Sequence, residues 1–167
     1  VLVAGLGLIG GSIAKSISKS GNFHVIGYDV NEASLQYALA EDVIHQYETD
    51  FEKASLLADV IILAAPISET IKLMKKIAEF PFKHEVIVSD VSSVKGSILE
   101  TANQLTNDKV TFIGGHPMAG SHKTGIEAAK EHLFENAIYV LTPTNDCTDD
   151  KLEQLKEVLG TTKCNFI

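Results

Sequence analysis

Short apolar runs rich in Val and Ile alternate along the chain with longer segments in which apolar residues recur every three or four positions. The short runs predict β-strands, and the longer segments predict helices. The run at 60–65 is almost continuously apolar, which is typical of a strand covered on both faces. The predicted strands are Val1–Ala4, His24–Asp29, Val60–Ala65, Val86–Asp90, Val110–Gly114 and Ile138–Leu141, with shorter ones near Gln46–Glu48 and Lys163–Ile167.

Helices are expected between these strands. Asn31 and Thr148 stand directly before two helical segments, where a short polar side chain can accept hydrogen bonds from the free amides of the first turn. The alternation of strand and helix is typical of βαβ units, so we predict an α/β fold with a mostly parallel sheet and helices on both faces. The expected helices are Leu8–Ser18, Glu32–Ala40, Phe51–Leu57, Glu69–Ala78, Val94–Leu105, Ile126–Leu133 and Asp149–Leu159.

Composition fits a single globular domain over 1–167, since 45% of the residues are hydrophobic and 22% are charged. All 14 basic residues are Lys, against 22 acids, which gives a net charge of -8. This balance excludes nucleic acid and anionic membranes as natural partners, because both attract clustered positive charge. No apolar run approaches the length of a membrane span or a signal peptide, so we expect a cytoplasmic protein. The chain opens on Val1 without Met, and we expect the gene product to be longer.

Metal and disulfide chemistry are not indicated. Cys147 and Cys164 lack a CxxC or Cys/His ligand pattern and fit reduced structural thiols. His116 and His122 do not form a recognised ligand set either, so no metal site is predicted.

A glycine fingerprint, Gly5-Leu6-Gly7-Leu8-Ile9-Gly10, directly follows the first predicted strand and opens a helix. That context indicates a Rossmann-type, doubly wound fold that binds a dinucleotide. The first glycine allows the tight turn, the second lets the backbone approach a pyrophosphate, and the third lets the helix pack closely. The phosphates would lie on the N–H groups at the start of the helix, among them those of Leu8 and Ile9.

Asp29 ends the second predicted strand, 19 residues after Gly10. This is the spacing expected of a carboxylate that accepts hydrogen bonds from the adenosine ribose hydroxyls. The same carboxylate would repel a 2′-phosphate, and no Arg follows to bind one. The sequence therefore favours NAD over NADP.

Two further segments lie at predicted carboxyl ends of strands, where open α/β sheets bind their ligands: 90–96 and 114–121. Pro117 holds His116 in an extended backbone, so we expect this His to project from a rigid loop as a general base. Ser93 stands at or next to the N-cap of the following helix. Lys95 opposes the helix dipole there, so it either serves an anionic ligand or is solvated.

Several of these motifs together resemble the prephenate dehydrogenase family. They are Gly5–Gly10 with Gly11-Ser12, Tyr28-Asp29, Ala65-Pro66, DVSSVK at 90–95 and HPMAGS at 116–121. The HPMAGS run after DVSSVK is the most specific element, since generic dinucleotide folds share only the glycines. The resemblance covers the chain as the family's N-terminal nucleotide-binding domain.

The resemblance implies NAD-dependent oxidative decarboxylation of prephenate to 4-hydroxyphenylpyruvate, in tyrosine biosynthesis. It implies that His116 accepts the proton of the substrate hydroxyl, that Ser93 orients this His and the nicotinamide, and that Ser121 lies beside the substrate. One base and good positioning suffice, because the ring becomes aromatic once CO2 departs. Lys95 is a further candidate for substrate binding, and Ala65, Pro66 and Asp90 join the fingerprint and Asp29 as candidates for cofactor binding.

The absence of Arg departs from the family, which binds the two prephenate carboxylates largely through Arg of a helical C-terminal domain. We expect that domain, and a homodimer formed through it, to lie outside these residues. Two alternatives stay open. The enzyme could use arogenate, alone or with prephenate, or the chain could be a dinucleotide-binding module without chemistry, against which His116 argues.

Overall fold

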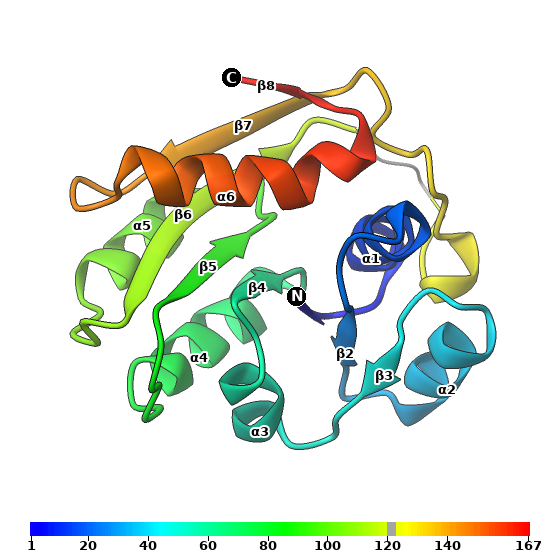
Figure 1. Ribbon diagram of the computed structural model, residues 1–167, viewed down its shortest axis with the longest axis horizontal. Helices are drawn as coiled ribbons and strands as arrows, with labels where there is room; N and C mark the ends of the chain where they lie inside the picture. The colour runs from blue at the N-terminus through cyan, green and yellow to red at the C-terminus, as the bar shows by residue number, and fades with distance from the viewer. Residues whose placement is uncertain (120–122) are drawn as a thin grey trace.

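The computed structural model describes residues 1–119 and 123–167. Within these residues eight strands form one sheet in the order β3-β2-β1-β4-β5-β6-β7-β8 (Figure 1). Neighbouring strands are parallel except β6 and β7, which are antiparallel. The strands are β1 (Leu2–Ala4), β2 (Ile26–Tyr28), β3 (Gln46–Tyr47), β4 (Val60–Leu63), β5 (Val86–Asp90), β6 (Val110–Pro117), β7 (Ile138–Pro143) and β8 (Asn165–Phe166).

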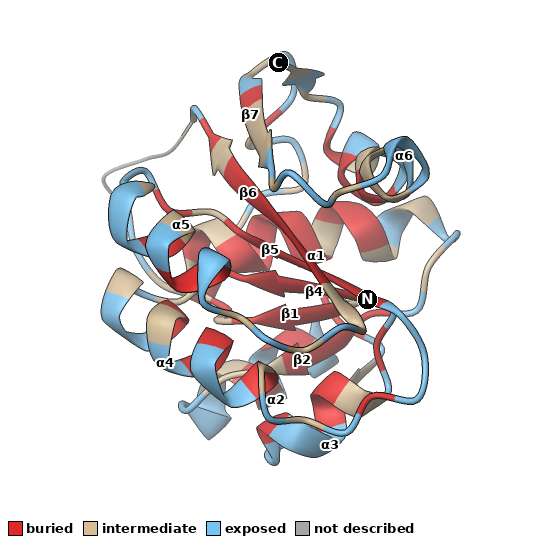
Figure 2. Ribbon diagram, turned by 90° about the vertical axis from the view of Figure 1, so that its left-hand side faces the viewer, coloured by how far each residue is buried: buried red, intermediate tan, exposed pale blue. Residues whose placement is uncertain are grey.

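Both faces of the sheet are buried. β1 contributes Val3 to one apolar core and Leu2 and Ala4 to the other, as the period-2 geometry of a strand requires. Helices α1, α2 and α6 cover the first core, and α3, α4 and α5 cover the second. The outer faces of α4 and α5 are exposed, whereas α1 is buried along most of its length (Figure 2). The predicted α/β fold is confirmed. The helices are α1 (Leu8–Ser20), α2 (Glu32–Ala40), α3 (Phe51–Leu56), α4 (Ile67–Ile77), α5 (Gly96–Asn103) and α6 (Asp149–Leu159).

The strand order creates a crevice at the carboxyl edge of the sheet. From β1 the chain first builds outward to β2 and β3, and it then returns to place β4 on the other side of β1 (Figure 1). Connections that leave neighbouring strands in opposite directions open a gap between them, which is where doubly wound folds bind their ligands. The glycine turn after β1 lies at this point.

One predicted helix, Ile126–Leu133, is wrong. Only a 3-10 turn forms at Ile126–Ala128, after Gly125 with φ +87°. The backbone beyond it makes only isolated turn bonds of its own, such as Leu133 N to the Lys130 carbonyl at 3.3 Å. It also bonds to α1: the Lys130 amide donates to Ser12 Oγ at 2.9 Å, and Ser16 Oγ donates to the Glu131 carbonyl. Tertiary hydrogen bonds thus replace the helical ones that the apolar periodicity predicts.

Other boundaries shift by a few residues. The strand predicted to end at Gly114 continues to Pro117, because β7 pairs with it through Val140 opposite His116. The predicted caps are confirmed, since the side chain of Asn31 accepts from Ala33 N at 3.0 Å and that of Thr148 accepts from Lys151 N at 3.4 Å. In the described part of the chain, every helix is too short or too polar to cross a membrane.

Tyr139 on β7 provides a test of the core. Its side chain is fully buried, and its hydroxyl has no hydrogen-bond partner among the described residues. Burial raises the pKa of Tyr139 far above its usual range, so the phenol stays neutral. A buried, unpaired polar group lowers stability. We expect Tyr139→Phe to raise the free energy of unfolding by about 1 kcal/mol and the melting temperature by roughly 2–4 °C.

The measurement is thermal and chemical denaturation of both proteins. Tyr37→Phe is the matched control, because Tyr37 is an exposed tyrosine on α2. A lower melting temperature for Tyr139→Phe would show that the hydroxyl contributes to stability after all.

Candidate functional site

The turn after β1 requires glycine at two positions. Gly5 has φ +96°, and a Cβ there would lie 2.7 Å from the Ala64 carbonyl carbon. A Cβ on Gly10 would overlap the carbonyl oxygen of Gly5 and approach Ala64 Cβ to 2.9 Å. These contacts give the first and third glycines the packing roles that the fingerprint predicts.

Gly7 differs, because a Cβ there would have no described atom within 4 Å. Gly7 is the N-cap of α1, makes no side-chain cap, and is followed by a first turn without acidic residues. The first amides of a helix have no partner inside it, and they carry the positive end of its dipole. The open side of Gly7 and the amides beyond it therefore suit a pyrophosphate.

Asp29 joins the end of β2 to this turn. Its Oδ2 accepts from Leu6 N at 2.7 Å, and its Oδ1 accepts from Asn31 N at 2.8 Å. A carboxylate offers about four acceptor sites, so lone pairs remain after these two bonds. Asp29 can therefore fix the turn and still accept hydrogen bonds from a ribose.

A hollow of about 260 Å³ lies over this turn. Five of the residues predicted to contact the cofactor line it: Gly5, Gly7, Asp29, Ala65 and Pro66. Leu8, Ile9 and Gly10 lie beside it at the start of α1. Sequence analysis missed part of the wall: Tyr28, Val30, Ala64, Glu69 and Leu73.

Asp90 and Lys95 require a correction. The Asp90 side chain is fully buried, so it has no surface with which to contact a cofactor. Its Oδ1 accepts from Gly115 N at 3.0 Å, and its Oδ2 accepts from Ser92 N at 3.0 Å and from Lys95 Nζ at 2.5 Å. Lys95 is therefore held by Asp90, with 19% of its side chain exposed, and is not the freely solvated or ligand-bound cation that the sequence predicts. Burial lowers the pKa of Lys95, although the hydrogen bond and the charge of Asp90 oppose this shift.

The Asp90 carboxylate holds the segments of both predicted catalytic residues. Gly115 precedes His116 on β6, and Ser92 precedes Ser93. His116 is partly exposed and extended, as Pro117 predicts, but it lies in a strand rather than a loop. Ser93 is exposed and does not cap α5, whose N-cap is Lys95.

Ser121, predicted to lie beside the substrate, falls outside the described residues. No group of side chains in 1–119 and 123–167 has the composition and spacing to hold a metal ion.

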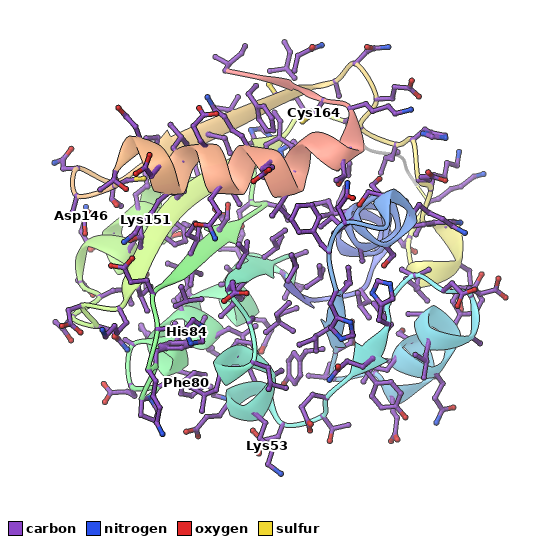
Figure 3. The ribbon with its side chains drawn as sticks, in the orientation of Figure 1. Lys53, Phe80, His84, Asp146, Lys151 and Cys164 are labelled. Atoms are coloured by element: carbon purple, nitrogen blue, oxygen red, sulfur yellow. The ribbon has the colours of Figure 1, made fainter. Side chains whose placement is uncertain are left out.

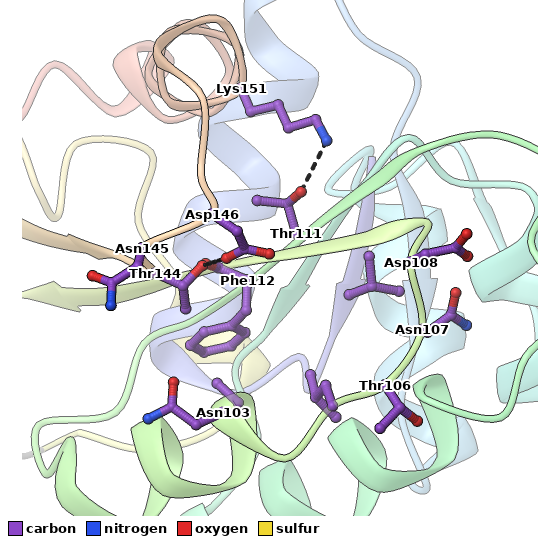
Figure 4. Close-up of a pocket in the computed structure, with 13 residues that line it drawn as sticks. Asn103, Thr106, Asn107, Asp108, Thr111, Phe112, Thr144, Asn145, Asp146 and Lys151 are labelled. Atoms are coloured by element: carbon purple, nitrogen blue, oxygen red, sulfur yellow. Dashed lines mark hydrogen bonds between the residues drawn. The ribbon is translucent and has the colours of Figure 1, made fainter.

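A larger hollow of about 560 Å³ lies at the opposite, amino edge of the sheet, between α5, the start of β6 and the start of α6 (Figure 4). Its labelled side chains Lys151 and Asp146 lie well away from α1 (Figure 3). They are already paired, because Lys151 donates to Thr111 Oγ1 at 3.0 Å and Asp146 accepts from Thr144 Oγ1 at 2.6 Å. The crevice at the carboxyl edge is the better candidate site.

Comparison with known proteins agrees with this assignment. Residues 13–167 match the family described as prephenate dehydrogenase, nucleotide-binding domain. The chain belongs to this family. It is 40% identical to the prephenate dehydrogenase of Bacillus subtilis (strain 168) over 168 residues, which is 100% of this chain and 45% of that protein. The chain thus spans about half of its curated prephenate dehydrogenase relative.

Solved structures related to the prephenate dehydrogenase family share the fold. Arogenate dehydrogenase from Synechocystis superposes with a TM-score of 0.89 at 34% identity, over 99% of this chain and 58% of that one. Prephenate dehydrogenase from A. aeolicus, in complex with hydroxyphenyl propionate and NAD+, gives a TM-score of 0.87 at 30% identity, over 99% and 58%.

The different surroundings of Gly7 and Gly10 give a paired prediction. Gly7→Ala should leave the fold intact and weaken NAD+ binding at least about tenfold, because the new methyl group lies where a pyrophosphate approaches the backbone. Gly10→Ala should instead lower stability by about 2–4 kcal/mol, because its methyl group meets backbone. Calorimetric titration and thermal denaturation separate the two effects. Gly96→Ala, in open space, is the control.

The ion pair of Asp90 and Lys95 gives a second prediction. Asp90→Asn leaves a half-buried ammonium without its counter-charge, so we expect a loss of about 3 kcal/mol in the free energy of unfolding. Adding Lys95→Met removes that ammonium and should recover part of the loss. Urea denaturation measures both, with Glu153→Gln, from an exposed pair, as the near-neutral control. An Asp90→Asn protein as stable as the original would contradict the stabilising role of this ion pair.

Proposed function

We propose that this chain is the NAD-binding part of a prephenate dehydrogenase, which converts prephenate to 4-hydroxyphenylpyruvate by oxidative decarboxylation. One observation carries the proposal. His116 lies at the end of β6, on the same edge of the sheet as the nucleotide-binding turn, in a chain 40% identical to a prephenate dehydrogenase. A base and a dinucleotide site on one edge are the two parts that this reaction needs.

NAD is the proposed cofactor. Its pyrophosphate fits the open side of Gly7 at the start of α1, and its adenosine ribose fits Asp29, whose carboxylate keeps free lone pairs. The complex of the A. aeolicus enzyme with NAD+ supports the same choice. When bound, NAD supplies the hydride acceptor.

His116 is the proposed base, because an imidazole readily takes a proton at physiological pH. It accepts the hydroxyl proton as the hydride leaves the same carbon. The bond from the ring to its carboxylate then breaks and CO2 departs. Its electron pair moves through the ring to the oxygen of the former hydroxyl, which takes back a proton, so that the product is an aromatic phenol. Ser93 is proposed to orient His116, and Ser121 to lie beside the substrate. Asp90 is proposed as a positioning residue, through the backbone amides of Gly115 and Ser92 and the ammonium of Lys95.

The cations that bind the two carboxylates of prephenate are proposed to lie mainly outside these 167 residues. Arg binds carboxylates best, and this chain has none. Lys95 is already engaged with Asp90. A homodimer formed through a further helical domain stays a prediction from the family resemblance, and a cytoplasmic location stays a prediction from the hydropathy of the sequence.

Arogenate is the alternative substrate. The similarity to the Synechocystis arogenate dehydrogenase, with a TM-score of 0.89, supports arogenate as this alternative. Arogenate differs from prephenate in the side chain, which carries an amine where prephenate has a ketone. The chemistry at the ring and the role of His116 are the same for both.

The test is steady-state reduction of NAD by the full-length protein. We expect His116→Asn to lower kcat by about 100-fold or more, with the affinity for NAD+ unchanged, because it removes the base and leaves the nucleotide turn intact. His132→Asn, an exposed His in the segment after β6, should keep normal turnover. Measuring prephenate beside arogenate decides the substrate. Unchanged turnover in His116→Asn would refute the assignment of the base, and NAD+ binding without turnover of either substrate would favour the non-catalytic module.

A further inference from the structure

We propose that Glu69 is a second determinant of selectivity for NAD over NADP, acting together with Asp29. The inference rests on the proposed use of NAD and deepens it. It assigns a role to a side chain that the sequence motifs do not include, and it predicts that the selectivity does not depend on Asp29 alone.

The two carboxylates line the same hollow from different walls. Asp29 follows β2 and Glu69 lies in the first turn of α4, just after β4, and β2 and β4 flank β1 on its two sides. The rest of the lining near them is apolar, with Val30, Pro66 and Leu73. This combination suits a flat adenine ring with its ribose held between acidic side chains.

The charge in this hollow is of one sign. Neither Lys nor Arg is among its lining residues. Burial raises the pKa of Tyr28, which also lines it, and the charges of Asp29, Glu69 and Asp50 raise it further. All three carboxylates therefore act on the same region. Lys72 Nζ lies 3.3 Å from Glu69 Oε1, but both side chains are exposed. Solvent therefore screens this pair, and Lys72 neutralises the charge of Glu69 only in part.

A 2′-phosphate carries nearly two negative charges, whereas the 2′-hydroxyl of NAD is neutral and can donate a hydrogen bond to a carboxylate. Two carboxylates in the wall thus repel the 2′-phosphate of NADP, a charge that NAD lacks, and so penalise NADP more than NAD. Glu69 needs no contact with the ribose to do this, because charge repulsion acts over several ångströms.

The charge of Glu69 can be removed without disturbing the glycine turn, whereas the charge of Asp29 cannot. Asp29 also binds the amides of Leu6 and Asn31, so any substitution there disturbs the glycine turn. Among the described residues, the Glu69 carboxylate has one hydrogen-bond partner, the exposed Lys72. Glu69→Gln therefore removes charge, keeps the side-chain shape, and leaves the turn in place.

The experiment is calorimetric titration of the protein with NAD+ and with NADP+ at low and high salt. We expect Glu69→Gln to strengthen NADP+ binding roughly three- to tenfold in dilute buffer and to leave NAD+ binding within about twofold. Lys72→Gln should act in the opposite direction, since it removes the partial neutralisation. Both effects should shrink in 1 M salt, where the screening length falls to about 3 Å.

Glu79→Gln is the matched control, because it makes the same charge change just beyond the far end of α4 and should not alter the selectivity. Unchanged NADP+ affinity in Glu69→Gln, an equal gain for NAD+, or the same gain in Glu79→Gln would overturn the role of Glu69 while NAD+ binding stands. Failure of the original protein to bind NAD+ would overturn the proposed function itself.

Discussion

The carboxylate of Asp90 connects the segment of His116 on β6 with the segment of Ser93 after β5. It has no exposed surface, and it accepts hydrogen bonds from Gly115 on β6, from Ser92 after β5 and from the ammonium of Lys95. A buried charge is tolerated only when it is paired and fully hydrogen-bonded, so these three donors must stay in place. The positions of His116 and of the Ser93 segment follow from this requirement.

Local signals in the sequence predict much of the fold. The glycine turn is predictable because its requirements are local. A Cβ on Gly10 would clash with the carbonyl oxygen of Gly5, five positions earlier, and the positive φ of Gly5 itself favours glycine. The caps at Asn31 and Thr148 are predictable for the same reason. The strands are predictable because both faces of the sheet are covered, which leaves near-continuous apolar runs such as 60–65.

Contacts between distant residues decide what the sequence does not predict. The segment after Gly125 has helical periodicity, yet Ser12 and Ser16 of α1 bind its backbone and hold it out of a helix. One exception is local: Lys95 lies five positions after its partner Asp90, but the pair forms only because the loop between β5 and α5 folds back. Glu69 lies in no recognised motif. Only the return of the chain from β3 to β4 brings it to the hollow that Asp29 also lines.

The central place of β1 also has a consequence for the order of folding. β1 pairs with β2 on one side and with β4 on the other, and both pairings are parallel. Parallel pairing needs a long crossover, so it forms late and slowly compared with local helices. The wall that Ala64 and Ala65 supply to the glycine turn exists only once β4 has joined β1. The nucleotide crevice is therefore a late product of folding, although its glycines lie far upstream of β4 in the sequence, and a chain arrested before β4 docks would carry the fingerprint without a binding site.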